Sequence, residues 1–409
     1  MRVVSSQQVA DVLAALPGEP RAVVSGNFAT PHVLVSALDG ALPRYRLFAL
    51  NAQTGLPVRP EVVLETCFVG PGMRRAPTLR YVPARLSLAP LLFRDSLPPD
   101  VVLLHTSQPH QGTVSLGIEV NILPAAIEAV RRRGGLVIAQ ANAQMPYTFG
   151  DGVLSLDDID YVVEVDEALP GPGEVVLDDE SRAIGERVAD LVNDGSTVQM
   201  GIGAIPDAAL HGMLRKRGLR IWSEMFSDGV LRLDEVGALD SEAPLVASFL
   251  FGSPQLYAWV HRNSRVRVQR TEKTNDPSVI AHNPQVVSIN SALQVDLFGQ
   301  ANASRINARI HSGFGGQTDF IVGALHSPGG QAILALRSWH PKADVSTVVP
   351  LVEEPVTSFQ PSAVVTEHGV ARLWGTSQVE QAAAMIEQVA HPRVREELWE
   401  EARVLGLAQ

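Results

Sequence analysis

Short apolar segments alternate with amphipathic helical segments along most of the chain. Residues 22–26 and 101–104 form apolar runs of strand length, and residues 31–38 follow the first run with helical spacing. Residues 122–133 show the same helical spacing, two glycines end them, and residues 136–139 form the next apolar run. Strands that alternate with helices are typical of parallel sheets. The pattern therefore predicts an α/β fold with mostly parallel sheets that helices cover on both faces.

A proline- and glycine-rich segment interrupts this alternation. Residues 170–173 have the sequence PGPG, and an acidic segment then opens a helix with Ile184 and Val188 on one face. Composition changes of this kind mark candidate linkers between domains. We therefore predict two α/β domains, an N-terminal domain of residues 1–175 and a C-terminal domain of residues 176–409.

Charge and hydropathy narrow the possible partners and location. The 409 residues include 33 Lys and Arg against 44 Asp and Glu, which gives a formal net charge of −11. Nucleic-acid binding needs concentrated positive charge, so we expect no nucleic-acid partner. No apolar run approaches the roughly 20 residues of a membrane span, and the first residues lack signal-peptide character. We expect a cytoplasmic protein without a membrane partner, and we predict that the single cysteine, Cys67, is a small buried thiol.

A tight glycine turn between a strand and a helix is the first candidate for ligand binding. The strand covers residues 196–200, and the helix is expected to begin at Pro206, whose missing N–H is not needed there. Two glycines let a ligand approach the backbone, and free N–H groups at a helix start suit an anion or a polarised carbonyl. Alternatively, the turn only packs the helix against the strand. The turn consists of Gly201, Ile202, Gly203, Ala204 and Ile205.

Glu224 follows the next predicted strand, which covers residues 219–222. Ligands of open α/β sheets lie outside the carboxyl ends of the strands, where this spacing places Glu224. The carboxylate is therefore either a catalytic group or a structural partner for a cation. It also stands at about the distance from Gly201 at which a dinucleotide-binding fold carries its ribose-binding acid. Pro206 replaces the third glycine of that fingerprint, so a nicotinamide-dependent oxidoreductase is the weaker hypothesis.

A third element consists of residues 290–300, followed by a second glycine-rich segment at residues 312–320. Gly313, Gly315 and Gly316 would bring backbone N–H groups against a ligand, and Asp319 would cap the following helix or brace the loop. As a bare glycine-rich turn, the segment is also compatible with a purely structural role. The histidines show neither His-x-x-His nor His-Glu-x-x-His spacing, so we predict no metal site.

Taken together, these segments resemble the acetyl-CoA hydrolase/transferase family, and in particular its 4-hydroxybutyrate and butyryl-CoA:acetate CoA-transferases. Two departures from the family pattern concern the acyl substrate more than the chemistry: residues 109–112 lack an acid, and His368 stands where the family usually has Tyr. The motifs that carry the resemblance are residues 68–74 (FVGPGMR), 201–206 (GIGAIP), 223–229 (SEMFSDG), 289–296 (INSALQVD), 315–320 (GGQTDF) and 364–371 (VVTEHGVA).

The resemblance implies two tandem domains of the NagB/RpiA/CoA-transferase-like fold, with the active site between them. It implies that Glu224 is a nucleophile that carries coenzyme A (CoA) as a glutamyl-CoA thioester. The implied activity moves CoA from an acyl-CoA to a small carboxylic acid of the 4-hydroxybutyrate, butyrate or acetate type. CoA is then a substrate, and no permanently bound cofactor is expected. An acyl-CoA hydrolase that uses the same site is the first alternative, and a non-enzymatic binding protein on the same scaffold is another.

The implied reaction also needs binding residues. We expect Gly203, Gly315 and Gly316 to direct backbone N–H groups at a tetrahedral intermediate. Arg74, Arg337 and Lys342 are candidates for binding the CoA phosphates, and the spacing does not select among them. A homodimer or larger homo-oligomer is the expected assembly. The residues implied to line the CoA site are Gly201, Ile202, Gly203, Ala204, Ile205, Leu293, Gly315 and Gly316.

Overall fold

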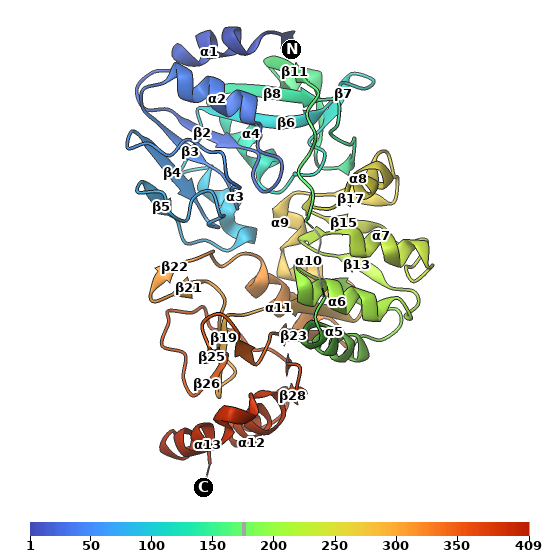
Figure 1. Ribbon diagram of the computed structural model, residues 1–409. Helices are drawn as coiled ribbons and strands as arrows, with labels where there is room; N and C mark the ends of the chain where they lie inside the picture. Colours follow the sequence, from blue (N-terminus) through green and yellow to red (C-terminus); the bar gives the residue numbers. More distant parts are fainter. Residues whose placement is uncertain (174–176, 409) are drawn as a thin grey trace. The chain divides into compact units, whose positions relative to one another are not determined.

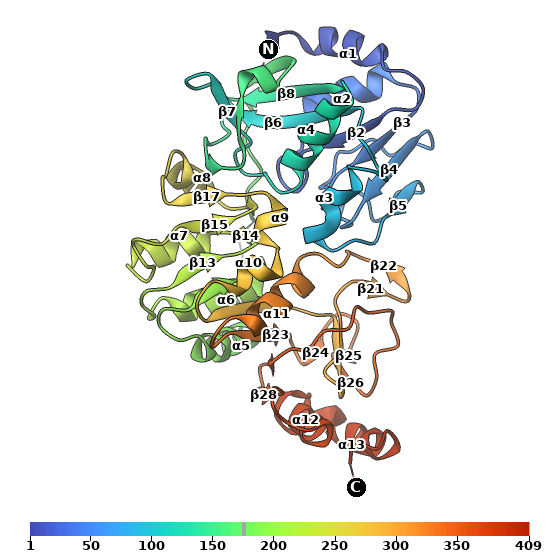
Figure 2. The same cartoon turned by 180° about the vertical axis from the view of Figure 1, so that it is seen from behind.

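The computed structural model describes residues 1–173 and 177–408 of the chain, shown from two sides in Figures 1 and 2. It divides into two compact units, each built from three chain segments. The predicted domain ranges, 1–175 and 176–409, stay a prediction, because units built from several segments do not test continuous boundaries. Unit 1 consists of Met1–Pro172, Pro244–Thr274 and Ile310–Gly315, and unit 2 consists of Gly173–Ala243, Asn275–Arg309 and Gly316–Gln409.

Unit 1 contains an eight-stranded sheet in the order β1-β11-β8-β6-β2-β3-β4-β5, and every neighbouring pair is parallel. All seven residues of the central strand β6 are buried, as expected for a parallel strand covered on both faces. The strands are β1 (Arg2–Val3), β2 (Arg21–Val24), β3 (Tyr45–Phe48), β4 (Val62–Thr66), β5 (Leu79–Tyr81), β6 (Val101–Ser107), β8 (Leu136–Asn142) and β11 (Tyr161–Val165).

Helices cover both faces of this sheet, which confirms the predicted α/β class. Helices α1 (Ser6–Ala14) and α2 (His32–Ala41) lie over one face in Figure 1, and α3 (Ala89–Leu92) and α4 (Leu123–Arg132) lie over the other in Figure 2. Val9 of α1 and Leu34 of α2 belong to the same buried apolar cluster as Leu47 and Leu103 of the sheet. Burial of such side chains is the main favourable term in folding.

Unit 1 also contains shorter elements. Strands β15, β17 and β9 pair in parallel, and β7 and β10 form an antiparallel pair. Cys67 lies directly after β4 and is 1 % exposed, which confirms the predicted buried thiol. Burial raises the pKa of this thiol to about 12, so it is not a nucleophile near neutral pH. The shorter elements are β7 (Thr113–Ser115), β9 (Phe149–Gly150), β10 (Val153–Ser155), β15 (Leu245–Ala247), β16 (Phe249–Leu250), β17 (Val266–Val268), η1 (Leu86–Leu88), η2 (Leu156–Asp158), α8 (Pro254–Val260) and α9 (Thr271–Thr274).

The main sheet strands of unit 2 run in the order β28-β27-β23-β18-β12-β13. They are parallel except for the antiparallel pair β27–β28. The segments between these main strands also contain smaller strands. They are β14 (Met225–Phe226), β19 (Gln294–Asp296), β20 (Ala301–Asn302), β21 (Arg305–Ile306), β22 (Arg309–Ile310), β24 (Trp339–His340), β25 (Val345–Ser346) and β26 (Val348–Val349). The main strands are β12 (Thr197–Gln199), β13 (Arg220–Trp222), β18 (Val286–Asn290), β23 (Gln331–Ala335), β27 (Ala363–Val365) and β28 (Val370–Arg372).

Helices α5 and α6 of unit 2 pack closely, because two glycines lie at their contact. A Cβ atom added at Gly185 would lie 2.4 Å from the backbone carbon of Ala208, and one added at Gly212 would lie 2.7 Å from the Cβ of Ala189. Figure 1 shows both helices in front of the unit 2 sheet. The helices of this unit are α5 (Asp179–Leu191), α6 (Ala204–Met213), α7 (Asp228–Glu235), α10 (Pro277–Ala281), α11 (Gln317–His326), α12 (Gln378–Ala384), η3 (Met385–Val389), η4 (Pro392–Val394) and α13 (Arg395–Val404).

One helix start differs from the sequence prediction. Helix α6 begins at Ala204 rather than at Pro206, because Gly203 serves as its N-cap with a φ of 122°. Residues other than glycine rarely adopt that backbone conformation. Pro206 is thereby the third residue of the helix, where its missing N–H still costs no intrahelical bond. Within residues 1–173 and 177–408, no helix is long and apolar enough to cross a membrane.

Candidate functional site

Four parallel strands of unit 2 end along one edge of the sheet. Gly201 follows β12 closely, Glu224 follows β13, Ser291 follows β18, and Arg337 follows β23. Because neighbouring strands are about 4.8 Å apart, side chains and backbone groups at these ends lie near one another. This edge is where open α/β sheets bind ligands. The structure thus confirms that Glu224 stands at a strand end.

Ser223 fixes the backbone just before Glu224. Its Oγ donates a hydrogen bond to the carbonyl oxygen of Met200 at 3.0 Å and accepts one from the Met200 N–H at 3.2 Å. Ser223 is fully buried, so these bonds replace those that its hydroxyl would make with water. The end of β13 is therefore tied to the end of β12, and the backbone of Glu224 has a defined position.

The carboxylate of Glu224 lies against the start of helix α11. The side-chain amide of Asn275 donates to Oε2 of Glu224 at 3.3 Å, and the backbone N–H of Gly316 also donates to the carboxylate. A Cβ atom at Gly316 would lie 2.1 Å from that Oε2 and 2.4 Å from Nδ2 of Asn275. Only glycine therefore lets the backbone approach the carboxylate this closely. Gly316 is the N-cap of α11, whose N-terminal partial charge also attracts an anion.

The surroundings nevertheless disfavour the ionised form of Glu224. Enclosure by the protein is the largest cause that raises its pKa, and the nearby carboxylate of Asp319 raises it further. The hydrogen bonds from Asn275 and Gly316 oppose this shift, and the resulting pKa is about 7. Strongly perturbed carboxylates in a cleft or strand-end position are candidates for catalysis. Glu224 is therefore the candidate catalytic group of this site.

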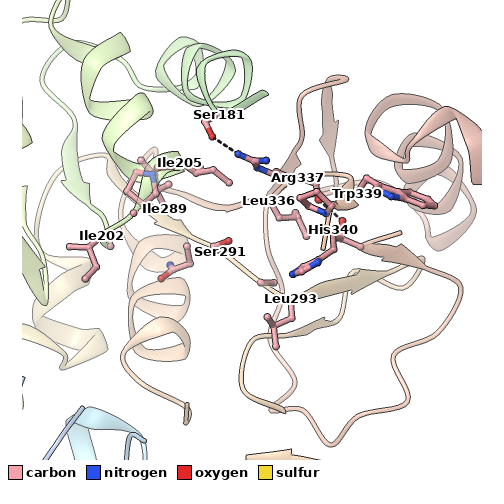
Figure 3. Close-up of a pocket in the computed structure, with 18 of the residues that line it drawn as sticks. Ser181, Ile202, Ile205, Ile289, Ser291, Leu293, Leu336, Arg337, Trp339 and His340 are labelled. Carbon is pink, nitrogen blue, oxygen red and sulfur yellow. Dashed lines mark hydrogen bonds between the residues drawn. The ribbon is translucent and has the colours of Figure 1, made fainter. Parts of the chain in front are cut away.

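A cavity of about 640 Å³ lies in unit 2 around the ends of β12, β18 and β23, and β12 pairs with β13, the strand that precedes Glu224. That volume is within the range of small-molecule sites. Its wall includes apolar side chains of Ile202, Ile205, Ile289, Leu293 and Leu336, which Figure 3 labels. Polar groups of the cavity come from the start of α5, from the ends of β18 and β23, and from the β24–β25 hairpin and the residue after it: Ser181, Asn290, Ser291, Arg337, His340, Lys342 and Thr347.

The structure brings most of the predicted binding residues together. Gly201, Ile202, Gly203, Ala204, Ile205 and Leu293 all line the cavity. Gly316 instead contacts Glu224, and Gly315 belongs to unit 1, where its φ is 57° and an added Cβ would lie 3.0 Å from the ring of Phe68. Binding of CoA by these eight residues stays a prediction.

Three features of the site were missed by sequence reasoning. Asn275 carries no motif signal, because it reaches Glu224 from a segment 51 residues away in the chain. Asp319 was expected to cap a helix or brace a loop, but it is buried in the first turn of α11, close to Glu224. The β24–β25 hairpin, which supplies His340 and Lys342 to the cavity, was not predicted at all. Its two-residue strands are too short to give a periodic pattern.

Arg337 lines the cavity but is held by acidic residues at the start of α5. Its guanidinium forms ion pairs with Asp178 and, at 3.1 Å, with Glu180, and it donates to the hydroxyl of Ser181 at 3.1 Å. Figure 3 shows the bond from Arg337 to Ser181. Asp178 is also the N-cap of α5, since its carboxylate accepts from the Ser181 N–H at 2.9 Å. The positive charge of Arg337 is therefore largely offset.

The motif at residues 364–371 anchors the segment next to this arginine. The carboxylate of Glu367 accepts hydrogen bonds from the backbone N–H of Ser338 at 3.0 Å and from the Ser338 hydroxyl. Nε2 of His368 lies 3.4 Å from the same carboxylate. These contacts fix the start of the chain that continues into the β24–β25 hairpin. Among the residues that the structure describes, no group of three or more His, Cys, Asp or Glu could hold a metal ion.

Known proteins resemble the chain over most of its length. A model of the acetyl-CoA hydrolase/transferase N-terminal domain matches residues 60–170, and the model of the C-terminal domain of the same family matches residues 252–402. The chain is 41 % identical over 333 residues to the 4-hydroxybutyrate coenzyme A transferase of Clostridium kluyveri, which covers 78 % of this chain and 76 % of that protein.

Two further comparisons extend over nearly the whole chain. The succinyl-CoA:acetate/propanoyl-CoA:succinate CoA transferase of Fasciola hepatica is 34 % identical over 405 residues, which cover 92 % of this chain and 83 % of that protein. The crystal structure of a 4-hydroxybutyrate CoA-transferase from Porphyromonas gingivalis matches with a TM-score of 0.83 and 32 % identity, over 99 % of this chain and 98 % of that one.

Proposed function

Because this chain belongs to the acetyl-CoA hydrolase/transferase family, we propose that it transfers CoA from an acyl-CoA to a small carboxylic acid, with Glu224 as the nucleophile. The observation that carries the proposal is the enclosed carboxylate of Glu224. It accepts hydrogen bonds from Asn275 and Gly316, and the strand before it pairs with the strand that leads to the cavity. The acid is of the 4-hydroxybutyrate, butyrate or acetate type. Family membership places CoA chemistry ahead of the nicotinamide alternative.

The proposed reaction divides the transfer of CoA into two half-reactions, and the second is the reverse of the first. The Glu224 carboxylate attacks the thioester carbonyl carbon, the C–S bond breaks, and CoA leaves as a thiolate, which gives an acyl-glutamyl anhydride. The thiolate then attacks the side-chain carbonyl carbon of Glu224 and releases the first acid as its carboxylate. The result is a glutamyl-CoA thioester, and an incoming carboxylate reverses the sequence. Covalent catalysis of this kind needs only one carboxylate and no metal.

The donors around Glu224 suit the second attack. When the thiolate adds to the Glu224 carbonyl carbon, negative charge develops on the side-chain oxygen. The amide of Asn275 and the N–H of Gly316 already point at that carboxylate, so they need no reorganisation. A positioned donor of this type contributes about 2.7–4 kcal/mol to transition-state stabilisation. We therefore add Asn275 to the Gly316 that the sequence suggested, and neither Gly203 nor Gly315 is needed for this step.

The cavity next to the site is the proposed position of CoA. Its apolar wall suits the pantetheine arm, and Gly201 and Gly203 present backbone to that wall without a side chain in between. An added Cβ at either glycine meets no atom within 4 Å, so these two glycines do not serve close packing of the protein with itself. Space left open at a strand end is consistent with approach of a ligand.

Substitution of Glu224 tests the proposal. We expect Glu224→Gln to lower the rate of CoA transfer from butyryl-CoA to acetate by about 10³-fold or more, because an amide is a poor nucleophile. Glu235→Gln is the matched control: Glu235 is exposed at the end of α7, in the same unit. Transfer is measured by chromatography of both acyl-CoA species, and circular dichroism checks the fold. Full activity of folded Glu224→Gln would contradict the proposal.

The family also includes hydrolases, and the same assay separates the two activities. A transferase should release little free CoA when no acceptor acid is present, since water must be kept from the glutamyl thioester. A hydrolase should release CoA thiol at a rate that added acetate does not change. We favour transfer. The cytoplasmic location and the homo-oligomeric assembly stay predictions.

A further inference from the structure

The structure distinguishes among the three cations that the sequence offered for the CoA phosphates. Arg74 belongs to unit 1, where its Nε donates to the carbonyl oxygen of His311 at 2.9 Å. Arg337 lines the cavity, but two carboxylates of the α5 start offset its charge. Lys342 lines the cavity and is exposed, and no carboxylate in the described ranges lies within ion-pair distance of it. Its charge is therefore available to a ligand.

Side-chain contacts of Trp339 hold the β24–β25 hairpin that carries Lys342. The indole N–H of Trp339 donates to Oδ1 of Asp344 at 3.0 Å, and the Trp339 ring centroid lies 4.9 Å from that of His391. The guanidinium carbon of Arg393 lies 4.5 Å from the centroid of the same indole ring, a cation–π contact. The hairpin is thus tied to the segment around His391 and Arg393, and His340 and Lys342 of the same hairpin line the cavity.

His340 supplies a second donor on the same hairpin. Its Nδ1 accepts a hydrogen bond from the backbone N–H of Ala343 at 3.0 Å, so in the neutral ring the proton is on Nε2. Figure 3 shows the ring of His340 projecting into the cavity on the side of Leu293. The Nε2–H group can therefore donate to an oxygen of a bound ligand. His340 and Lys342 together form a donor pair suited to an anion.

The cavity consequently has an apolar wall and, at the hairpin, an end with hydrogen-bond donors. Ile202, Ile205 and Ile289 make one wall apolar, whereas the hairpin end offers an ammonium group and an imidazole N–H. This arrangement fits a ligand that has a weakly polar arm and ends in phosphate groups. On the premise of the proposed CoA-transferase function, we propose that Lys342 and His340 bind the phosphates of CoA. Lys342 is then the residue by which the enzyme distinguishes acyl-CoA from acyl-pantetheine, which has the same arm but no nucleotide.

The kinetic test compares these two substrates in two lysine variants. We expect Lys342→Met to raise KM for butyryl-CoA about 10-fold, as for loss of a hydrogen bond to a charged group, and to leave kcat unchanged. KM for butyryl-pantetheine should not change, because that substrate never reaches Lys342. Lys216→Met, in the same unit but outside the cavity lining, is the control and should behave as wild type with both substrates. Lys342→Arg should keep KM for butyryl-CoA near the wild-type value.

Several outcomes would overturn the assignment. It fails if Lys342→Met leaves KM for butyryl-CoA unchanged, or if it raises KM for butyryl-pantetheine by the same factor. Butyryl-3′-dephospho-CoA separates the phosphates: an unchanged effect of Lys342→Met points to the diphosphate, and a lost effect to the 3′-phosphate. Calorimetric titration with CoA and with pantetheine decides the assignment even if no thioester turns over. Absence of transfer in the wild type would refute the proposed function alone.

Discussion

At the scale of single residues, Glu224 must be ionised to attack a thioester, and its surroundings oppose ionisation. Enclosure by the protein and the carboxylate of Asp319 raise its pKa to about 7, against an ordinary value of 4.5. A carboxylate with a raised pKa is a stronger nucleophile once ionised, since its conjugate acid is weaker. The same environment thus increases reactivity and moves the titration into the neutral range.

This shift predicts the pH dependence of the first half-reaction. Below pH 7 the folded enzyme holds Glu224 mainly protonated, so kcat/KM for the acyl-CoA should rise with pH and level off above about 7. Removal of the donor in Asn275→Ala should move the inflection to higher pH, because the hydrogen bond from Asn275 favours the ionised form. Initial rates across pH 5 to about 9 at low substrate report the free enzyme. An inflection near the ordinary 4.5 would show that Glu224 is not perturbed.

The contact between Gly316 and Glu224 predicts the effect of one added methyl group. Gly316→Ala would place its Cβ 2.1 Å from Oε2 of Glu224, so the carboxylate must move. A displacement of about 1 Å at a reacting group costs about 10²-fold in rate, and we expect a loss of kcat of that size. Gly40→Ala is the control, because an added Cβ meets no atom within 4 Å there. Unchanged kcat in Gly316→Ala would mean that the carboxylate acts from another position.

At the scale of secondary structure, the start of α5 combines a cap and an ion pair. Asp178 caps the helix and pairs with Arg337, and these contacts lower the pKa of Asp178 to about 2. Because this pKa is lowered in the folded state, the stabilisation is present at neutral pH and is lost as the pH falls toward 2. The helix start is therefore linked to a residue of the cavity wall.

We expect Asp178→Ala to lower the free energy of unfolding at pH 7 by about 1 kcal/mol, the usual cost of a lost N-cap. Asp179→Ala is a close control, since Asp179 is fully exposed and its carboxylate lies 4.0 Å from Nε of Arg182. Urea unfolding followed by circular dichroism measures both variants. Equal stability of the two would show that the cap at residue 178 contributes nothing.

Elements with a clear hydrophobic pattern in the sequence have nearly the predicted bounds in the structure. The strand before Glu224 was predicted at residues 219–222 and is Arg220–Trp222, because its apolar run has a clear beginning and end. The start of α6 was wrong by two residues, since the positive φ of Gly203 is not visible in a hydrophobic pattern. Arg337 was a candidate for phosphate binding, but its partner Asp178 lies 159 residues away in the chain. Pairings over such separations depend on the folded sheet and leave no local signature.

At the scale of the whole molecule, the proposed enzyme carries CoA from one acid to another. The first acid must leave before the second acid enters, because both react at the same carboxylate of Glu224. We therefore expect ping-pong kinetics, with parallel lines in double-reciprocal plots of rate against butyryl-CoA at several acetate concentrations. Intersecting lines would indicate that both acids bind together, and direct transfer without a covalent intermediate would then be required.

The covalent intermediate itself provides the most direct measurement. The enzyme is incubated with butyryl-CoA without an acceptor, reduced with borohydride, digested and analysed by mass spectrometry. Borohydride reduces a thioester to an alcohol, whereas a free carboxylate does not react. We predict that the modified residue is Glu224 and that Glu224→Gln shows no modification. An unmodified Glu224 in enzyme that still transfers CoA, or modification of a different residue, would contradict the central claim.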